Sequence, residues 1–230
     1  MSQPARMEPP LVADYSPVAR VYPFLEYAAF GPALMRARTA HLGRLAAPPA
    51  RALLLGEGDG RFLRALLRRW PECAVTVVDA SPAMLAAARR RAPAGSHIDA
   101  IKADIRAWAA AGDSPPASYD LVATHFLFDC LPDSHHPALV AAIERCLSPG
   151  GLWLYSDFAA PGAAPTRAGR HARDLAQRAL YGTLGRLTWH PNRAFTPPHA
   201  LAAAHGLARL AHTRHARGLV ESLVLGKRAP

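Results

Sequence analysis

Residues 53–60 read Leu-Leu-Leu-Gly-Glu-Gly-Asp-Gly, an apolar triplet that runs directly into a loop with glycine at every second position. The triplet predicts a buried strand, and the residues that follow Gly60 place their apolar side chains at helical spacing. Glycine lets the backbone turn sharply and approach a ligand closely, and the start of a helix offers exposed N–H donors. The stretch therefore predicts a strand, a loop and a helix that together hold a nucleotide-type cofactor.

The spacing of the glycines narrows the choice of cofactor. Dinucleotide-binding loops have the pattern G-x-G-x-x-G, whereas here the third glycine comes one residue early, at Gly60, and Arg61 occupies the sixth position. No G-x-x-x-x-G-K-[ST] motif is present, which excludes a phosphate loop of the ATPase kind. Asp79 ends the next apolar run, and a carboxylate there suits the ribose hydroxyls of an adenosine cofactor. An acidic cap for the helix that begins at Pro82 is the alternative interpretation of Asp79.

From residue 51 onward, short apolar runs alternate with segments of helical spacing. The apolar runs lie at 52–55, 74–78, 97–101, 119–124 and 152–156, and the helical segments at 60–70, from 81, at 105–110 and from 133 to about 148. This alternation predicts an α/β domain with a mainly parallel sheet covered on both faces. Two further strand-like runs, 206–212 and 219–225, have no helix between them and predict an antiparallel hairpin.

Three segments are assigned outside or around this sheet. Residues 1–14 are rich in proline and polar residues and are expected to be disordered, while 15–230 are expected to form a single domain. Residues 15–47 predict a helical cover at its N-terminal side. Residues 158–198 predict an insertion after the fifth strand, with a helix at about 166–187, and such an excursion is well placed to form a wall for a substrate.

Composition limits the classes of partner. The net charge is +10, but 25 of the 27 basic residues are arginine and they are spread along the chain, whereas a nucleic-acid footprint gathers on one face. We therefore expect a small-molecule partner and no nucleic acid. No apolar run approaches the ~20 residues of a membrane span, and no secretory signal precedes the domain, so the expected location is the cytoplasm. The three cysteines have no C-x-x-C spacing, so no disulfide framework or metal site is expected.

Five segments, taken in order, carry a resemblance to a known family. They are Leu-Leu-Gly-Glu-Gly-Asp-Gly, Val-Val-Asp-Ala-Ser-Pro-Ala-Met-Leu, Lys-Ala-Asp-Ile, Tyr-Asp-Leu-Val-Ala-Thr-His-Phe and Leu-Ser-Pro-Gly-Gly. With them, residues 51 to about 156 resemble the cofactor half of the small bacterial type 11 class I S-adenosylmethionine-dependent methyltransferases. The resemblance implies a Rossmann-like, doubly wound sheet of seven strands with an antiparallel C-terminal strand, which also accounts for the hairpin.

The resemblance also implies roles for particular residues. Gly56, Gly58 and Gly60 would pack against the methionine and ribose of S-adenosylmethionine, and Asp79 would hold the ribose hydroxyls. The other implied contacts are Ala80 and Met84 at the adenine faces, Asp104 and Ile105 at its edge, His125 near the sulfonium, and Tyr22 from the helical cover. An acidic residue that the family often has two positions before the first glycine is Leu54 here, and Glu57 is expected to take over its polar role. For Asp104 the alternative is a helix cap, and for Tyr22 packing on one helix face.

The expected reaction is transfer of a methyl group to oxygen, nitrogen or carbon of a small, partly hydrophobic metabolite. His125 is the candidate general base, because imidazole titrates near neutrality, although it could equally only shape the cofactor pocket. Asp129, Asp157 and Tyr181 are candidates for binding the substrate. The pair His135-His136, at the start of a later helix, is expected to face solvent. Two alternatives stay open, an RNA acceptor and a non-catalytic methyltransferase-like module that acts through binding.

Overall fold

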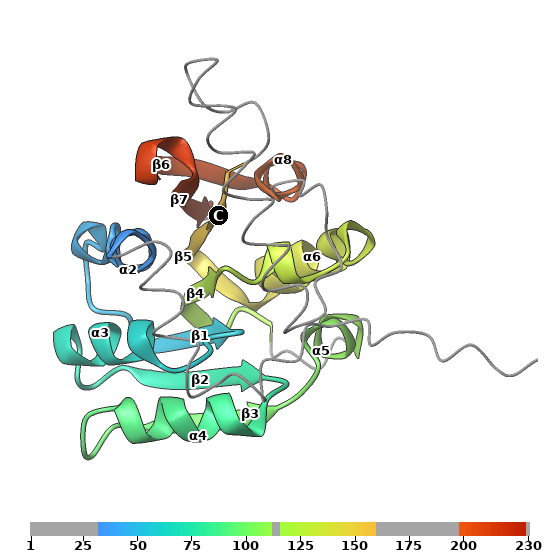
Figure 1. Ribbon diagram of the computed structural model, residues 1–230. Helices are drawn as coiled ribbons and strands as arrows, with labels where there is room; N and C mark the ends of the chain where they lie inside the picture. The colour runs from blue at the N-terminus through green and yellow to red at the C-terminus, as the bar shows by residue number, and fades with distance from the viewer. Residues whose placement is uncertain (1–31, 112–115, 160–197, 229–230) are drawn as a thin grey trace, which may run out of the picture.

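A seven-stranded sheet forms the centre of the computed structural model, which describes residues 32–111, 116–159 and 198–228 (Figure 1). The strands are β1 (Arg51–Leu55), β2 (Ala74–Asp79), β3 (Ile98–Lys102), β4 (Tyr119–His125), β5 (Leu147–Phe158), β6 (Leu207–His215) and β7 (Val220–Lys227). Their order is β3-β2-β1-β4-β5-β7-β6. Only β7 runs against its neighbours, since it pairs antiparallel with both β5 and β6 while the other pairings are parallel. The predicted doubly wound sheet with a reversed C-terminal strand is thereby confirmed.

Helices cover both faces of the sheet (Figure 1). One face carries α2 (Ala33–Thr39), the 3-10 helix η2 (Leu42–Arg44), α3 (Arg61–Arg69) and α4 (Pro82–Arg91). The other carries α5 (Ile105–Ala111), α6 (His136–Cys146) and α8 (His199–Ala204). Three further 3-10 turns are η3 (Phe128–Cys130), η4 (Asp133–His135) and η5 (Ala216–Gly218). The sheet thus has a separate apolar core on each side.

Alternation along each strand distributes side chains between the two cores. On β1, Leu54 packs with Phe62 of α3, whereas Leu53 packs on the other face with Trp153 of β5. All of these side chains are almost fully buried, as expected for parallel strands with both faces covered. Trp153 keeps its polar atom satisfied, because its indole Nε1–H donates to Thr124 Oγ1 at 2.8 Å. Burial on both faces fixes the register of the strands.

The helix α4 begins as its sequence predicts. Ser81 is its N-cap, with Oγ accepting a hydrogen bond from Met84 N at 3.3 Å, and Pro82 occupies the first turn. The start of α3 lies against the later part of α4, because Gly60 has φ +83° and a Cβ there would lie 2.5 Å from the Cα of Ala88. A glycine is therefore required at Gly60 both for its backbone conformation and for this close approach.

Some expectations need correction or fall outside the described residues. The strand expected at 152–156 begins earlier, at Leu147, because its first residue already pairs with Tyr119 of β4. The helix α8 has no counterpart among the expected segments. His136 does not face solvent: it is 1% exposed, and its Nε2 lies 3.0 Å from the carbonyl oxygen of Phe128. The expected insertion helix, most of the N-terminal cover, Tyr22 and Tyr181 lie outside the described ranges.

Two findings bear on partners. Within the described ranges, no helix is both long and apolar enough to cross a bilayer. In those same ranges, no three His, Cys, Asp or Glu side chains gather in a way that could hold a metal ion. The division into domains and the cytoplasmic location stay predictions.

Candidate cofactor site

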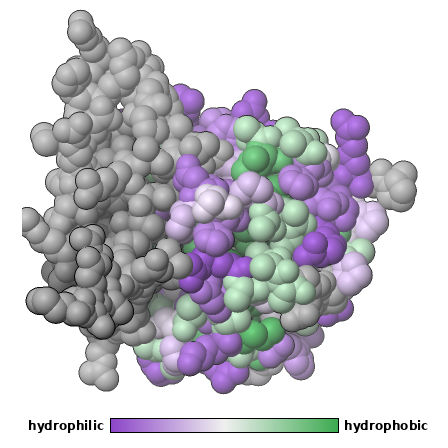
Figure 2. Space-filling view, turned by 90° about the vertical axis from the view of Figure 1, so that its right-hand side faces the viewer, coloured by the Kyte–Doolittle hydropathy of each residue, from purple (hydrophilic) through white to green (hydrophobic). Residues whose placement is uncertain are grey.

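The strand order changes direction between β1 and β4, and this topology predicts a crevice there. From β1 the chain crosses to α3 on one face, whereas from β4 it continues to α6 on the other. In open α/β sheets a ligand binds at the carboxyl ends of the strands where the crossovers diverge in this way. The arrowheads of β1 and β2 point to the right in Figure 1, and Figure 2 views the molecule from that side, where hydrophilic and hydrophobic residues are intermixed.

The glycine loop follows β1, and its three glycines meet different surroundings. All three have positive φ, +63° at Gly56, +68° at Gly58 and +83° at Gly60. A Cβ on Gly56 would lie 2.7 Å from Leu127 Cδ1, so this glycine lets the loop after β4 approach β1. A Cβ on Gly58, in contrast, would meet nothing within 4 Å. Of the three glycines, Gly58 therefore borders open space, and a ligand could approach the backbone there.

Asp79, at the carboxyl end of β2, joins the glycine loop to the turn before α4. Its Oδ2 accepts a hydrogen bond from Gly58 N at 3.2 Å and its Oδ1 accepts one from Ser81 N at 2.8 Å. Burial raises the pKa of this carboxyl, and the two N–H donors oppose the shift. Each carboxylate oxygen has a further lone pair. The side chain can therefore hold the loop in place and still accept hydrogen bonds from two neighbouring hydroxyl groups.

Glu57 turns its carboxyl toward the N-terminus of α3. Its Oε1 accepts a hydrogen bond from Leu63 N at 2.9 Å, which satisfies one of the free N–H groups at the start of the helix. Burial raises the pKa of Glu57 from 4.5 to about 7. The carboxyl thus stabilises the junction of loop and helix, and the expectation that it replaces an acidic residue at Leu54 stays a prediction.

The loop also contains an acidic residue to which the sequence pattern assigned no role. Asp59 is only 6% exposed and pairs with Arg61 at 2.9 Å and with Arg91, from the last turn of α4, at 3.1 Å. The pairing of Asp59 with Arg61 is local in sequence, because Arg61 follows Asp59 by two residues. The contact with Arg91 depends on the packing of α3 against α4, which a local pattern does not predict.

The residues expected around an adenine ring lie beyond the ends of β2 and β3. Ala80 is exposed, whereas Met84 and Ile105 are buried. Asp104 is engaged by Arg106: its Oδ1 accepts from the backbone N of Arg106 at 2.9 Å and from Nε at 3.1 Å. These hydrogen bonds lower the pKa of Asp104. The structure thus contains a contact that a helix cap at Asp104 requires, the hydrogen bond from Arg106 N. The role of Asp104 at adenine stays a prediction.

His125 ends β4 with its ring on the face covered by α3. The ring lies edge-on to Phe62, with centroids 4.4 Å apart, and the residue is 6% exposed. Neither ring nitrogen has a hydrogen-bond partner among the described residues. Burial, with smaller effects from Arg38 and His41, lowers the pKa of His125 well below 6.5. The ring is therefore a neutral, packed side chain in this state, and its role as a base stays a prediction.

Phe126, directly after His125, adopts an unusual backbone conformation that no sequence signal indicates. Its φ is +57°, and its backbone N donates to Ser156 O at 2.8 Å. The Arg38 guanidinium carbon lies 4.7 Å from the centre of the Phe126 ring. An aromatic residue in the left-handed region costs about 1–3 kcal/mol, and such residues gather at functional sites. The ring is partly exposed at the end of β4, beside the crevice.

The two carboxyls proposed for substrate binding are buried side by side. Asp157 lies within β5, and its two oxygens accept hydrogen bonds from Phe128 N at 3.1 Å and Phe158 N at 2.8 Å. Burial, followed by the charge of Asp129, raises the pKa of Asp157 well above its usual value. Asp129 itself is 3% exposed. The structure brings Asp129 of η3 next to Asp157 of β5, and binding of a substrate by either residue stays a prediction.

The central part of the chain is similar to known methyltransferase sequences. A family model described as a methyltransferase domain matches residues 52–151. A trans-aconitate 2-methyltransferase from Streptomyces avermitilis is 31% identical over 172 residues, which cover 73% of this chain and 60% of the relative. One from Azoarcus sp. is 38% identical over 98 residues, or 43% of this chain and 35% of the relative. The chain thus spans 35% and 60% of the lengths of these two relatives.

Solved structures share the arrangement of strands and helices. The N-methyltransferase NodS from Bradyrhizobium japonicum, in complex with S-adenosyl-L-homocysteine, matches with a TM-score of 0.58 at 18% identity, over 84% of this chain and 83% of that chain. Human N-acetylserotonin methyltransferase, in complex with S-adenosylmethionine, matches with a TM-score of 0.60 at 20% identity, over 84% of this chain and 52% of that chain. At these identities the likeness establishes the fold.

Proposed function

We propose that this chain, whose residues 52–151 match the family model of a methyltransferase domain, binds S-adenosylmethionine and transfers its methyl group to a small, partly hydrophobic carboxylic acid. One observation carries the proposal. The Asp79 carboxylate, with acceptor capacity to spare, lies beside Gly58, the glycine of the loop that borders open space. Both lie at the carboxyl ends of the strands, next to the β1–β4 crevice.

The residues of the loop fit an adenosine cofactor of this kind. Asp79 would accept hydrogen bonds from both ribose hydroxyls, and the bare backbone at Gly58 would allow the methionine part to approach. The ring of Phe126 and the buried Leu127 would border the crevice on the β4 side and exclude water. When bound, S-adenosylmethionine supplies a methyl carbon activated by the sulfonium, so the chain needs mainly to position the two reactants in line.

The acceptor group is proposed from the names of the relatives and from the state of His125. Both relatives are named for trans-aconitate, a carboxylic acid. A carboxylate is already ionised at neutral pH, so transfer to its oxygen requires no general base. A buried, neutral His125 without a hydrogen-bond partner among the described residues is compatible with such an acceptor.

Calorimetric titration with S-adenosylmethionine tests the cofactor half of the proposal. We expect micromolar binding that Asp79→Ala weakens by ~1–3 kcal/mol, because a charge-assisted hydrogen-bond partner is lost. Asp99→Ala removes the same charge from an exposed site on β3 and serves as the matched control. Asp79→Asn and thermal melts of each variant separate loss of the ligand contact from loss of the loop structure. Absence of binding by the unaltered chain would refute the proposal and favour a non-catalytic module.

The acceptor half is tested separately, with S-adenosylmethionine and trans-aconitate followed by mass spectrometry. A product heavier by one methylene, and cleaved by mild base as an ester is, would support a carboxylate acceptor. If the chain binds S-adenosylmethionine but methylates no member of a panel of di- and tricarboxylic acids, the acceptor class is wrong while the cofactor assignment stands.

A further inference from the structure

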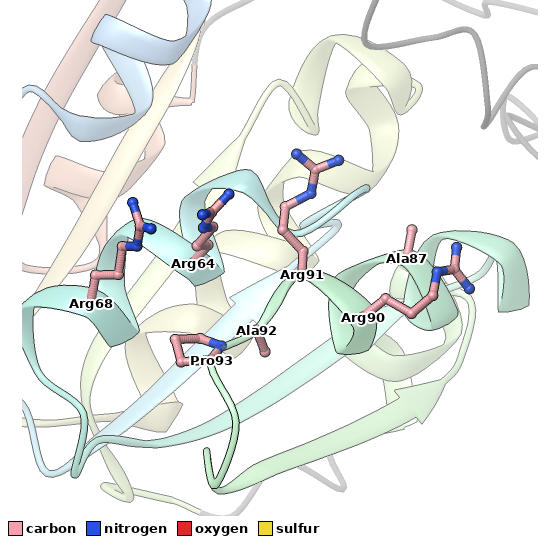
Figure 3. Close-up of a pocket in the computed structure, with 7 residues that line it drawn as sticks. All are labelled: Arg64, Arg68, Ala87, Arg90, Arg91, Ala92 and Pro93. Carbon is pink, nitrogen blue, oxygen red and sulfur yellow. The ribbon is translucent and has the colours of Figure 1, made fainter.

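A concave site lies between α3 and α4 (Figure 3). The groove has a volume of about 580 Å³. It is lined by Arg64, Arg68, Ala87, Arg90, Arg91, Ala92 and Pro93. Four of these seven residues are arginines, two from each helix, and the rest are small and apolar.

The positive charge of the groove is largely uncompensated. Arg64, Arg68 and Arg90 are exposed, and none has an ion-pair partner among the residues that the structure describes. Arg91 is the exception, because it pairs with Asp59 at 3.1 Å. Three exposed guanidinium groups therefore line one groove without a counter-charge from the part of the chain that the structure describes.

This groove is distinct from the proposed cofactor site. The helix α4 begins at Pro82, just after Asp79 at the carboxyl end of β2, whereas Arg90 and Arg91 occupy its last turn. A helix of this length spans ~15 Å. Arg91 reaches back to Asp59 of the glycine loop, but the lining of the groove includes none of the residues assigned to the cofactor. A ligand in the groove would leave the crevice beside Gly58 free.

We propose that the groove binds a compact oligophosphate. A guanidinium group presents a planar fork of N–H donors that matches two oxygens of a phosphate, and it stays charged at any physiological pH. Arg64 and Arg68 stand four residues apart on α3, about 6 Å along one face, so they can bind successive phosphates of one chain. In Figure 3 the Arg90 side chain points away from Arg64 and Arg68, and Arg91, from the last turn of α4, extends between them at the other wall.

The size and lining of the groove favour a small anion over a nucleic acid. Its volume lies within the range of small-molecule sites. None of the described residues that line it is aromatic, so it offers no ring on which a base could stack. The site would therefore recognise phosphate charge, and not a base.

Calorimetric titration with inorganic tripolyphosphate at low ionic strength tests the proposal, without S-adenosylmethionine or any measurement of activity. We expect binding that Arg64→Gln combined with Arg68→Gln weakens by about tenfold or more. The matched control combines Arg209→Gln with Arg228→Gln, which removes the same charge from exposed positions on β6 and after β7. Arg91 is left intact because it also holds Asp59. If the α3 double variant melts early, Arg68→Gln alone, at an exposed position, provides the test.

Three outcomes would overturn the proposal. Equal weakening by the two double variants would mean that tripolyphosphate responds only to net charge. Equally tight binding of citrate would mean that the groove does not select phosphate. Tight binding of a short single-stranded RNA, without binding of tripolyphosphate, would instead make the groove part of a nucleic-acid surface.

Discussion

Glu57→Gln replaces a partly buried carboxyl by a neutral amide of the same shape. In the unaltered chain, burial raises the pKa of Glu57 from 4.5 to about 7. The hydrogen bond from Leu63 N acts in the opposite direction and lowers this pKa, but its effect is smaller. The folded chain therefore keeps a proton on Glu57 at pH values at which the unfolded chain has released it. Glutamine retains an oxygen that can accept from Leu63 N but cannot titrate.

The sign and size of the effect follow from linkage. Between pH 4.5 and about 7 the folded state binds more protons than the unfolded state, so the free energy of unfolding falls as the pH rises through this window. One pH unit corresponds to ~1.4 kcal/mol, which gives ~3.5 kcal/mol for the whole interval as an upper bound. The exposed area of Glu57 shows that the side chain is only partly buried, so solvent screens part of this effect. We therefore expect a change of ~1–2 kcal/mol in the free energy of unfolding. Glu57→Gln should be the more stable chain by that amount at about pH 8.

Urea unfolding at about pH 5, 6.5 and 8, followed by tryptophan fluorescence, measures this difference. Other titrating groups contribute to both chains and cancel when the two are subtracted. Glu72→Gln, at an exposed position, makes the same change of charge and should run parallel to the unaltered chain at every pH. If Glu57→Gln also runs parallel to it, the Glu57 carboxyl is not desolvated at the start of α3, and its assigned role at the junction of loop and helix is wrong.

Two further substitutions test the packing around the loop. Gly60→Ala should lower the free energy of unfolding by about 2–4 kcal/mol, because its Cβ would lie 2.5 Å from Ala88 Cα and its φ is +83°. Urea unfolding measures the loss, with Gly43→Ala as the control, because a Cβ at Gly43 meets nothing within 4 Å. Equal losses in the two variants would contradict the prediction. Ser81→Ala should cost about 1 kcal/mol by removing the cap on Met84 N, measured in the same way, and an unchanged midpoint would show that the cap contributes nothing.

The sheet can be predicted because its signals are local. The inner strands β1 and β4 are buried on both faces, so each appears in the sequence as a short apolar run, and the helices between the runs show their own period. The hairpin of β6 and β7 is recognisable because no helix separates its two runs. The helix α8 escapes prediction because its six residues, His199–Ala204, are too few to show a period.

The candidate site is less predictable, because side-chain direction depends on pairing. Leu121 and Ala123 pack in the core under α3, and a period of two places His125 on the same face, so alternation along β4 can indicate its burial. The contact between Asp129 and Asp157 has no such signal. It forms because η3 folds back over the end of β5, and the path of this turn cannot be read from the residues themselves.

The positions of the arginines in the folded chain are also not predictable from the sequence. Counted along the chain, the arginines are dispersed, and this dispersion favours a solvated surface over a binding site. In the folded chain, however, Gly60 lets α3 approach α4 closely enough for Ala88 to touch it, and that contact sets the distance between the two rows of arginine. Arg64 and Arg68 then line the same groove as Arg90, although more than twenty residues separate them in the sequence. A glycine that fits the pattern of a cofactor loop thus also shapes a basic groove behind it, which is why neither composition nor motif spacing alone predicts the groove.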